Sequence, residues 1–160
     1  MRSLFLSLAL LVAPVSSQAE TLVGLVVAIN DGDTLVLQVD RQRHTLRLSG
    51  IDAPERVQSF GSRSMANLGQ WVFQKQATAE CATRGGEGIS RCKVLVAGMD
   101  VGLRQLADGM AWRLQPGDEA ETPEVGLAYQ QAEMMAKLRR LGLWSETNPT
   151  PPWDWKKLRR

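Results

Sequence analysis

The sequence contains very little histidine and cysteine. Its 160 residues include one histidine, His44, and two cysteines, Cys81 and Cys92. Protein zinc sites take most of their ligands from these residue types, and a paired Cys-x-x-Cys motif needs a closer spacing than these cysteines have. The sequence therefore excludes a zinc centre of the common structural kinds.

A large excess of charge of either sign is also absent. The formal net charge is +2, with 22% charged and 44% hydrophobic residues, which is typical of a globular protein. Attraction for nucleic acid would therefore have to come from local basic clusters rather than from an overall positive field. One cluster contains Arg41, Arg43, His44 and Arg47, and the other contains Lys156, Lys157, Arg159 and Arg160. We interpret the second cluster as a solvated, frayed terminus.

No hydrophobic run is long enough to span a bilayer. An apolar stretch at residues 4–15 follows Arg2 and precedes the small-x-small motif Ser17-Gln18-Ala19, which is the pattern of a secretory signal peptide. We expect residues 1–19 to be removed by cleavage after Ala19, and an uncleaved N-terminal anchor is the alternative. The mature protein is then exported, to the periplasm or the medium, without a membrane segment.

Export bears on the state of the two cysteines. An oxidising compartment favours disulfide formation, and several glycines lie between Cys81 and Cys92. We expect one disulfide that closes this glycine-rich loop. A pair of unlinked, buried thiols is the alternative.

Three segments with β-type patterns follow one another through short connections. Residues 21–29 form a nearly continuous aliphatic and β-branched run, and residues 34–39 form a second run after the turn signal Asp31-Gly32. Residues 45–48 alternate polar and apolar side chains. This order predicts a β-meander. Residues 77–97 predict a further β-hairpin with the cysteine loop at its tip.

Three later segments show helical patterns. Residues 62–76 place apolar side chains at spacings of three and four, a short helix is expected between Asp100 and Gly109, and the longest helix spans residues 124–140. In the longest helix we expect a core-facing stripe formed by Leu127, Met134, Leu138 and Leu141.

The domain is expected to cover residues 20–146, followed by a basic tail of residues 147–160. The tail is rich in proline, and we expect it not to be helical at its prolines. Its two tryptophans, Trp153 and Trp155, are expected to pack back on the domain. No internal repeat and no second domain are present.

Acidic residues and one arginine gather around the second and third predicted strands. Asp31 and Asp33 open the second strand, Asp52 and Glu55 follow the third, and Arg47 lies within it. If these strands pair, the carboxylates and the guanidinium converge at one end of a small sheet. Carboxylate oxygens suit a hard divalent cation, and a guanidinium suits a phosphate group.

The order of these elements comes with four motifs, DGDT, RLSGIDAPE, DVGLRQLADGMAW, and RRLGLW followed by PPWDW. Together they resemble the staphylococcal nuclease (thermonuclease) family, over nearly all of the chain after the signal peptide. The resemblance implies a mainly β protein with α-helices, an OB-fold five-stranded barrel with three helices. It also implies a calcium-dependent phosphodiesterase that cuts DNA and RNA.

The resemblance assigns roles to individual residues. The calcium ligands of the family are matched by the carboxylates of Asp33 and Asp52 and by the main-chain carbonyl of Ala53. Asp31 matches an acidic position beside the metal. Glu55 matches the general base proposed for the attacking water, and Arg47 matches one of two arginines that hold the scissile phosphate.

The second of these arginines is not in register in this sequence. Read through the glycines, the position falls on Glu87, and read backward from the next strand it falls on Ile89. Arg91 would share a strand face with both, one two-residue step of roughly 6.6 Å from Ile89. Arg91 is therefore the candidate substitute, and Arg84 is the alternative.

A second departure follows the short helix, where family members tend to carry tyrosines that contact the substrate. This chain has Trp112 and Arg113 there. Trp112 could stack on a base of a single strand and Arg113 could pair with a phosphate. A place for Trp112 in the core is the alternative.

The resemblance, together with the residues that match it, implies a nuclease that hydrolyses DNA, RNA or both with Ca²⁺, with activity reduced by the displaced second arginine. We expect it to be a monomer. The alternative is an OB module that binds nucleic acid without cutting it. A third interpretation, an exported structural or protein-binding barrel, leaves the metal-type carboxylates without a role.

Overall fold

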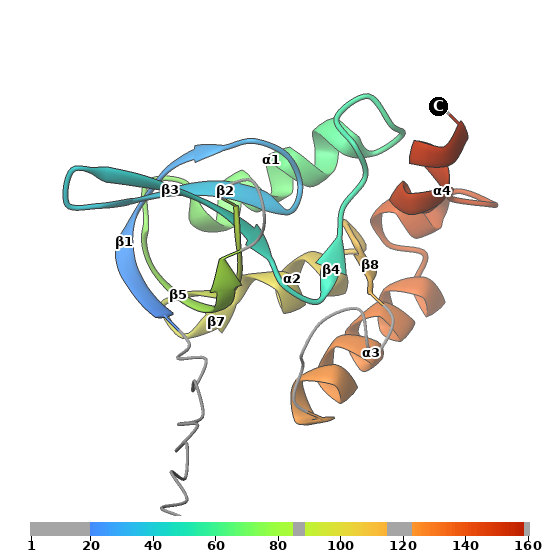
Figure 1. Ribbon diagram of the computed structural model, residues 1–160. Helices are drawn as coiled ribbons and strands as arrows, with labels where there is room; N and C mark the ends of the chain where they lie inside the picture. Colours follow the sequence, from blue (N-terminus) through green and yellow to red (C-terminus); the bar gives the residue numbers. More distant parts are fainter. Residues whose placement is uncertain (1–19, 85–88, 115–122, 159–160) are drawn as a thin grey trace, which may run out of the picture.

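A closed five-stranded β-barrel forms the centre of the structure, a computed structural model that describes residues 20–84, 89–114 and 123–158 (Figure 1). The strands pair in the order β3-β2-β1-β5-β6, and a parallel pairing of β3 with β6 closes the barrel. The strands are β1 (Glu20–Ile29), β2 (Thr34–Val39), β3 (Gln42–Leu48), β5 (Gln76–Arg84) and β6 (Ser90–Val96). Strand β7 (Met99–Asp100) extends the sheet beside β6, and β4 (Ile51–Asp52) pairs separately with β8 (Trp112–Arg113). The predicted OB-type barrel is confirmed.

Alternation along β2 and β3 decides which side chains enter the barrel. Leu35, Leu37 and Leu46 are fully buried, and Leu48 is nearly so. Because successive side chains of a strand point to opposite faces, Arg47 is directed out of the barrel between two buried leucines. Strand β3 begins before the expected residue 45, because the chain reverses tightly with Asp40 in the left-handed region at φ 52°.

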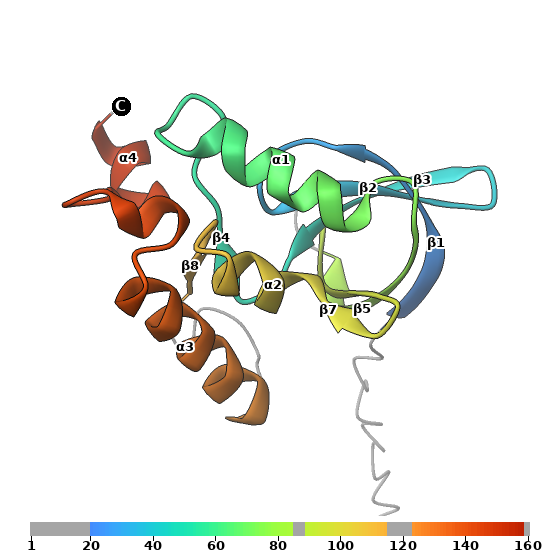
Figure 2. The ribbon, with the colours of Figure 1, turned by 180° about the vertical axis from the view of Figure 1, so that it is seen from behind.

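Two helices pack on one side of the barrel, as Figure 2 shows. Helix α1 (Gly61–Val72) ends earlier than predicted, because Gln74 adopts φ 58° and its N–H donates to Val26 O of β1 at 3.0 Å. Helix α2 (Val101–Ala107) begins and ends as predicted. The Asp100 side chain accepts a hydrogen bond from the N–H of Leu103, and Gly109 follows the helix at φ 67°.

Helix α3 (Pro123–Leu138) is found where it was predicted, but the predicted core stripe is wrong. Leu127, Met134 and Leu138 are 55%, 51% and 71% exposed. Another stripe with helical spacing faces the core. Tyr129 and Ala136 are buried there, and Val125 and Ala132 are partly buried beside them.

Tyr129 explains which of the two stripes of α3 faces the core. Its hydroxyl donates to the Asp100 carboxylate at 2.9 Å. A Cβ atom on Gly102 would approach that hydroxyl to 2.7 Å, so the absence of a side chain there admits the tyrosine. Sequence spacing identifies the most hydrophobic stripe of a helix, but it does not reveal a polar contact such as that of Tyr129 with Asp100.

The C-terminal segment contains a helix that includes Pro152, although no helix was expected at the prolines of this segment. After the 3₁₀ turn η2 (Gly142–Ser145), helix α4 (Pro152–Leu158) begins at a proline. Proline is tolerated in the first helical turn, where its missing N–H would have no intrahelical partner. The structure therefore has four α-helices in its described part, one more than the resemblance implies.

The predicted signal peptide, residues 1–19, lies outside the described residues, as do Glu87, Arg159 and Arg160. Among the helices that the structure describes, none is long and apolar enough to cross a membrane.

Cys81 and Cys92 form the expected disulfide, which joins β5 to β6 directly across their antiparallel register. Both residues are buried in the barrel core. The bond therefore ties together the two strands that lead into the barrel-closing contact of β6 with β3.

We expect the double variant Cys81→Ala/Cys92→Ala to lose about 2–3 kcal/mol of unfolding free energy, because the unfolded chain is no longer restrained by the short closed loop. Urea unfolding followed by tryptophan fluorescence measures the change. Reductant should destabilise the wild type by a similar amount and leave the variant unaffected. Equal stability of the two oxidised proteins would contradict the expectation.

Candidate active site

The turn between β1 and β2 places the first two aspartates. The backbone N–H of Asp33 donates to Asp31 Oδ1 at 3.0 Å, which fixes the Asp31 side chain against the backbone of Asp33. Helix α1 covers the turn so closely that a Cβ atom on Gly32 would collide with Ser64. Gln105 of α2 donates to Gly32 O at 2.6 Å. The acidic turn is therefore held from behind by both helices.

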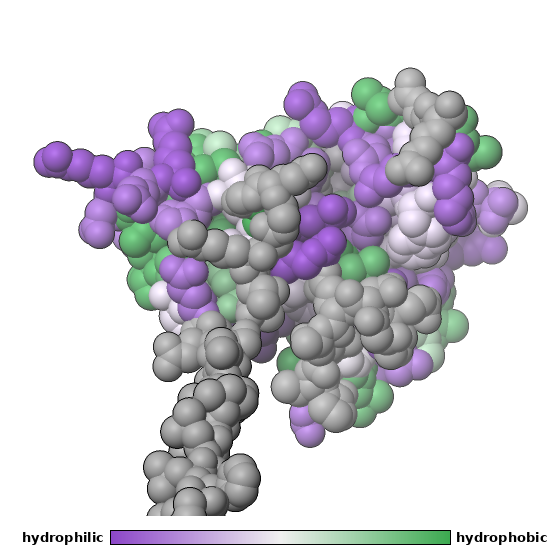
Figure 3. Space-filling model, in the orientation of Figure 1, coloured by the Kyte–Doolittle hydropathy of each residue, from purple (hydrophilic) through white to green (hydrophobic). Residues whose placement is uncertain are grey.

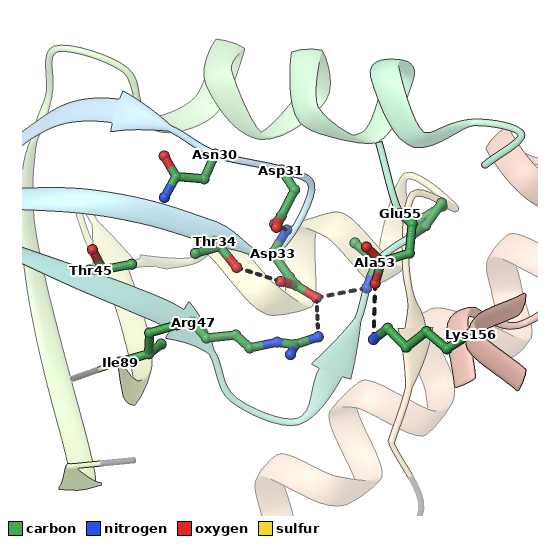
Figure 4. Close-up of a pocket in the computed structure, with 11 residues that line it drawn as sticks. Asn30, Asp31, Asp33, Thr34, Thr45, Arg47, Ala53, Glu55, Ile89 and Lys156 are labelled. Carbon is green, nitrogen blue, oxygen red and sulfur yellow. Dashed lines mark hydrogen bonds and ion pairs between the residues drawn. The ribbon is translucent and has the colours of Figure 1, made fainter. Parts of the chain in front are cut away.

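Strand β4 brings the second acidic segment against the first. The N–H of Ala53 donates to Asp33 Oδ2 at 2.9 Å, and Asp52 precedes it in the short pairing with β8. Beyond Pro54, the N–H of Glu55 donates to Gln58 Oε1 at 3.2 Å, and Gln58 N–H donates back to Glu55 O at 2.8 Å. This turn directs Glu55 toward the same space as Asp33 (Figure 4).

Arg47 links the two acidic segments. Its Nη2 donates to Asp33 Oδ2 at 3.2 Å and to Asp52 Oδ1 at 2.5 Å. Its Nε is buried and has no hydrogen-bond partner among the residues that the structure describes. Because a guanidinium carries five N–H donors and this side chain is 27% exposed, Arg47 can also donate to an acceptor in the adjoining space while it holds the carboxylates.

These side chains border a cleft of about 410 Å³. Figure 3 shows hydrophilic side chains in the middle of this face, between the barrel strands and the C-terminal helices. The cleft is lined by Asn30, Asp31, Asp33, Thr34, Thr45, Arg47, Ala53, Pro54, Glu55, Ile89 and Lys156 (Figure 4).

The charges of the cleft are unbalanced. Burial raises the pKa of Asp31 to about 6, and the charge of the adjacent Asp33 adds to this effect. Burial also raises the pKa of Asp52 to about 6, against the opposing charge of Arg47. Burial lowers the pKa of Arg47, but the charges of Asp33 and Asp52 outweigh it and the net shift is upward. The guanidinium is thus a fixed cation among carboxylates that repel one another.

The structure brings together most of the residues singled out in the sequence. Asp31, Asp33, Ala53, Glu55 and Arg47 line the cleft, and Asp52 contacts Arg47 from behind. No three His, Cys, Asp or Glu side chains converge as a ready metal-ligand set within the described ranges. A cation held by Asp33, Asp52 and the carbonyl of Ala53 would therefore also need water ligands.

The residues proposed to replace the second arginine differ in their positions relative to the cleft. Arg91 is exposed and pairs in register with Arg47 in the parallel contact of β6 with β3. Two residues earlier, Ile89 lines the cleft, whereas Arg91 is not among the lining residues. Arg84 ends β5, and its side chain lies outside what the structure describes.

Trp112 takes the core position that was its alternative role. It is 6% exposed, and its ring meets the edge of Trp144 with the ring centroids 5.5 Å apart. The neighbouring Arg113 is half-buried in β8, and its N–H donates to Glu133 Oε1 at 3.0 Å.

Lys156 is the cleft residue that the sequence analysis missed. Its Nζ lies 2.9 Å from Glu55 Oε1 and 3.8 Å from Asp52 Oδ2, so interpreting it as part of a frayed terminus was wrong. A usable signal was present: a proline, an acid in the first turn (Asp154) and lysines in the last turn form a helix pattern. No sequence pattern indicates where such a helix docks.

Comparisons with known proteins agree with this geometry. The family described as "Staphylococcal nuclease homologue" matches residues 45–146. "Protein ParB" of Escherichia coli is 33% identical over 94% of this chain and 88% of its own length. "Micrococcal nuclease" of Shigella flexneri is 35% identical over 84% of this chain and 80% of its own. An "Uncharacterized endonuclease" of Haemophilus influenzae is 33% identical over 82% of this chain and 71% of its own length.

The acidic excess of the cleft has a measurable effect on stability. Because the folded protein raises the pKa of Asp31 from 3.8 to about 6, its ionised form destabilises the folded state at neutral pH. Asp31→Asn removes this charge and keeps an Oδ1 acceptor for the N–H of Asp33. We expect the unfolding free energy in chelator at pH 7 to rise by on the order of 1 kcal/mol, after allowing for partial exposure of the group.

The pH dependence distinguishes this cause from a change in packing. The gain should shrink as the pH falls from about 6 toward 4, because the carboxyl group is then protonated in both states. Urea unfolding at several pH values measures it. A gain that is independent of pH would contradict the electrostatic explanation.

Proposed function

The chain belongs to the staphylococcal nuclease family, and from this premise we propose that it is a calcium-dependent nuclease that hydrolyses phosphodiester bonds of DNA, RNA or both. The observation that carries the proposal is the Arg47 guanidinium, which is anchored by Asp33 and Asp52, is 27% exposed at its side chain, and lines a cleft that also contains Glu55. A phosphate oxygen is the acceptor that this donor suits.

We propose that Asp33, Asp52 and the carbonyl of Ala53 hold Ca²⁺. The chemistry of the donor set fits, because calcium prefers oxygen ligands. Burial raises the pKa of Asp52, the negative charge of Asp33 adds to this effect, and a divalent cation beside these carboxylates would offset both. When bound, the ion would offset the charge of the substrate phosphate and of the carboxylates. Asp31 contributes further negative charge next to Asp33.

The other residues act on the phosphate and on the attacking water. Arg47 holds the scissile phosphate and stabilises the charge that grows on its oxygens as the bond to water forms and the bond to the leaving oxygen breaks. Glu55, 39% exposed at its side chain, accepts the proton of the attacking water. Arg91 adds positive charge on the same outer strand face as Arg47.

Export to the periplasm or the medium is part of the proposal. The Cys81–Cys92 disulfide supports an oxidising compartment, and the signal-peptide pattern of residues 1–19 agrees with it.

One observation favours the alternative of a binding module that cuts weakly or not at all. Ile89 lines the cleft, and it is one of the two positions to which the resemblance can assign the second arginine. An apolar side chain there contributes no charge to the transition state, so the strand side of the cleft depends on Arg47.

We expect the purified protein to cut single-stranded and duplex DNA with Ca²⁺ and to stop when a chelator is added. Glu55→Gln should lower kcat by about 100-fold or more, because it removes the proton acceptor while keeping the shape of the side chain. Gel analysis of labelled oligonucleotides measures both effects.

A matched control for this variant is Glu80→Gln, which removes an exposed carboxylate on β5, a strand that contributes none of the described lining residues of the cleft. It should cut at the wild-type rate. If a folded wild-type protein binds oligonucleotide but never cuts it, the nuclease is excluded and the binding module remains.

A further inference from the structure

Helix α4 follows residues 45–146, over which the family described as "Staphylococcal nuclease homologue" matches, and it reaches the cleft. Figures 1 and 2 both show it beside the loop that precedes α1. Two hydrogen bonds hold the segment before α4 against the loop that precedes α1. Gln58 donates to Thr150 O at 2.5 Å, and Ser59 hydrogen-bonds to Glu146.

The helix itself is well defined by local contacts. The N–H groups of Asp154 and Trp155 donate to Pro151 O at 3.1 and 3.0 Å. Pro152 is buried, and the half-buried Trp155 borders a small cavity together with Trp112 and Leu143 of the main body. Lys156 therefore projects from an anchored helix rather than from a loose end.

Lys156 crosses the cleft toward Arg47. Figure 4 shows the two side chains extending from opposite walls, with their terminal nitrogens directed toward one another. Lys156 Nζ pairs with Glu55 at 2.9 Å and approaches Asp52 at 3.8 Å, and Asp52 also binds Arg47. Both cations thus meet at the same acidic cluster.

The positive charge of Lys156 compensates for the lack of a second cationic side chain on the strand side of the cleft. Among the described residues that line the cleft, Arg47 and Lys156 are the two cationic ones, and Ile89 occupies the strand wall. A phosphate that enters the cleft therefore meets a guanidinium from one wall and an ammonium from the other. An ammonium on a flexible stem can change partners from a carboxylate to a phosphate oxygen.

We propose that Lys156 is a substrate-binding residue of this active site, which holds the scissile phosphate from the wall opposite Arg47. The proposal rests on the proposed nuclease function and assigns to α4 the second cation that β6 does not place in the cleft. Before substrate enters, Lys156 pairs with Glu55 and lies near Asp52. Lys156 therefore also competes with a metal ion for the charge of Asp52.

The test compares Lys156→Met with a matched control, Lys157→Met. Lys157 is the next residue of the same helix, but its ammonium pairs with Asp154 at 3.0 Å and its side chain is 74% exposed. With Ca²⁺ and a single-stranded oligonucleotide, Lys156→Met should lower kcat/KM by about 10- to 100-fold, and Lys157→Met should stay within about twofold. Lys156→Arg should recover most of the loss, because it restores a cation at this wall.

Two further measurements do not depend on cutting. Binding of a phosphorothioate oligonucleotide, followed by fluorescence anisotropy, should weaken about 10-fold in Lys156→Met and remain unchanged in Lys157→Met. Calcium titration without nucleic acid, followed by calorimetry, should show tighter binding in Lys156→Met, because the competing ammonium is gone. Thermal unfolding confirms that each variant is folded.

The outcomes separate this proposal from the function on which it rests. A wild-type protein that does not cut contradicts the nuclease, and the oligonucleotide binding of Lys156→Met then decides the role of Lys156 alone. Wild-type or faster cutting by Lys156→Met would overturn the proposal and identify Lys156 as a residue that obstructs the cleft. Unchanged oligonucleotide binding by this variant would overturn it as well.

Discussion

The guanidinium of Arg47 lies between the carboxylates of Asp33 and Asp52, and the architecture of the cleft depends on this contact. Each carboxylate is buried, so each would be costly to place there without a partner of opposite charge. Asp33 lies in the turn before β2, Asp52 lies in β4, and Arg47 lies in β3 between them. One cation therefore fixes three successive segments of the chain at the same end of the barrel.

The remaining structure supports this arrangement from two sides. Leu46 and Leu48 bury the inner face of β3, so the strand cannot rotate without exposing them, and Arg47 keeps its outward direction. On the other side, Gln105 reaches from α2 to the carbonyl of Gly32 and also donates to Ser64 O of α1 at 3.2 Å. A fully buried glutamine with these partners holds the acidic turn in place without adding charge to it.

Local sequence patterns predicted the parts of the fold that local physics determines. Short-range spacing predicts the strands of the meander and the Asp100 cap of α2. Spacing and the family resemblance together predict that Arg47 lies close to the acidic side chains of Asp31, Asp33, Asp52 and Glu55. The orientation of α3 could not be predicted, because two stripes were available and the choice depends on the contact of Tyr129 with Asp100. Lys156 was missed because its partner Glu55 is distant in sequence, and no spacing rule connects a terminal helix to a particular cleft.

The two halves of the cleft differ greatly in how far apart their residues lie along the chain. The contacts among Asp33, Arg47, Asp52 and Ala53 span separations of 5 to 20 residues. The contact of Lys156 with Glu55 closes a loop of about a hundred residues, and the entropy lost on loop closure grows with loop length. Contacts of short separation also form early and cheaply during folding. The acidic half of the site can thus assemble with the first hairpins of the barrel, while the lysine wall is added only after the rest of the chain has folded around it.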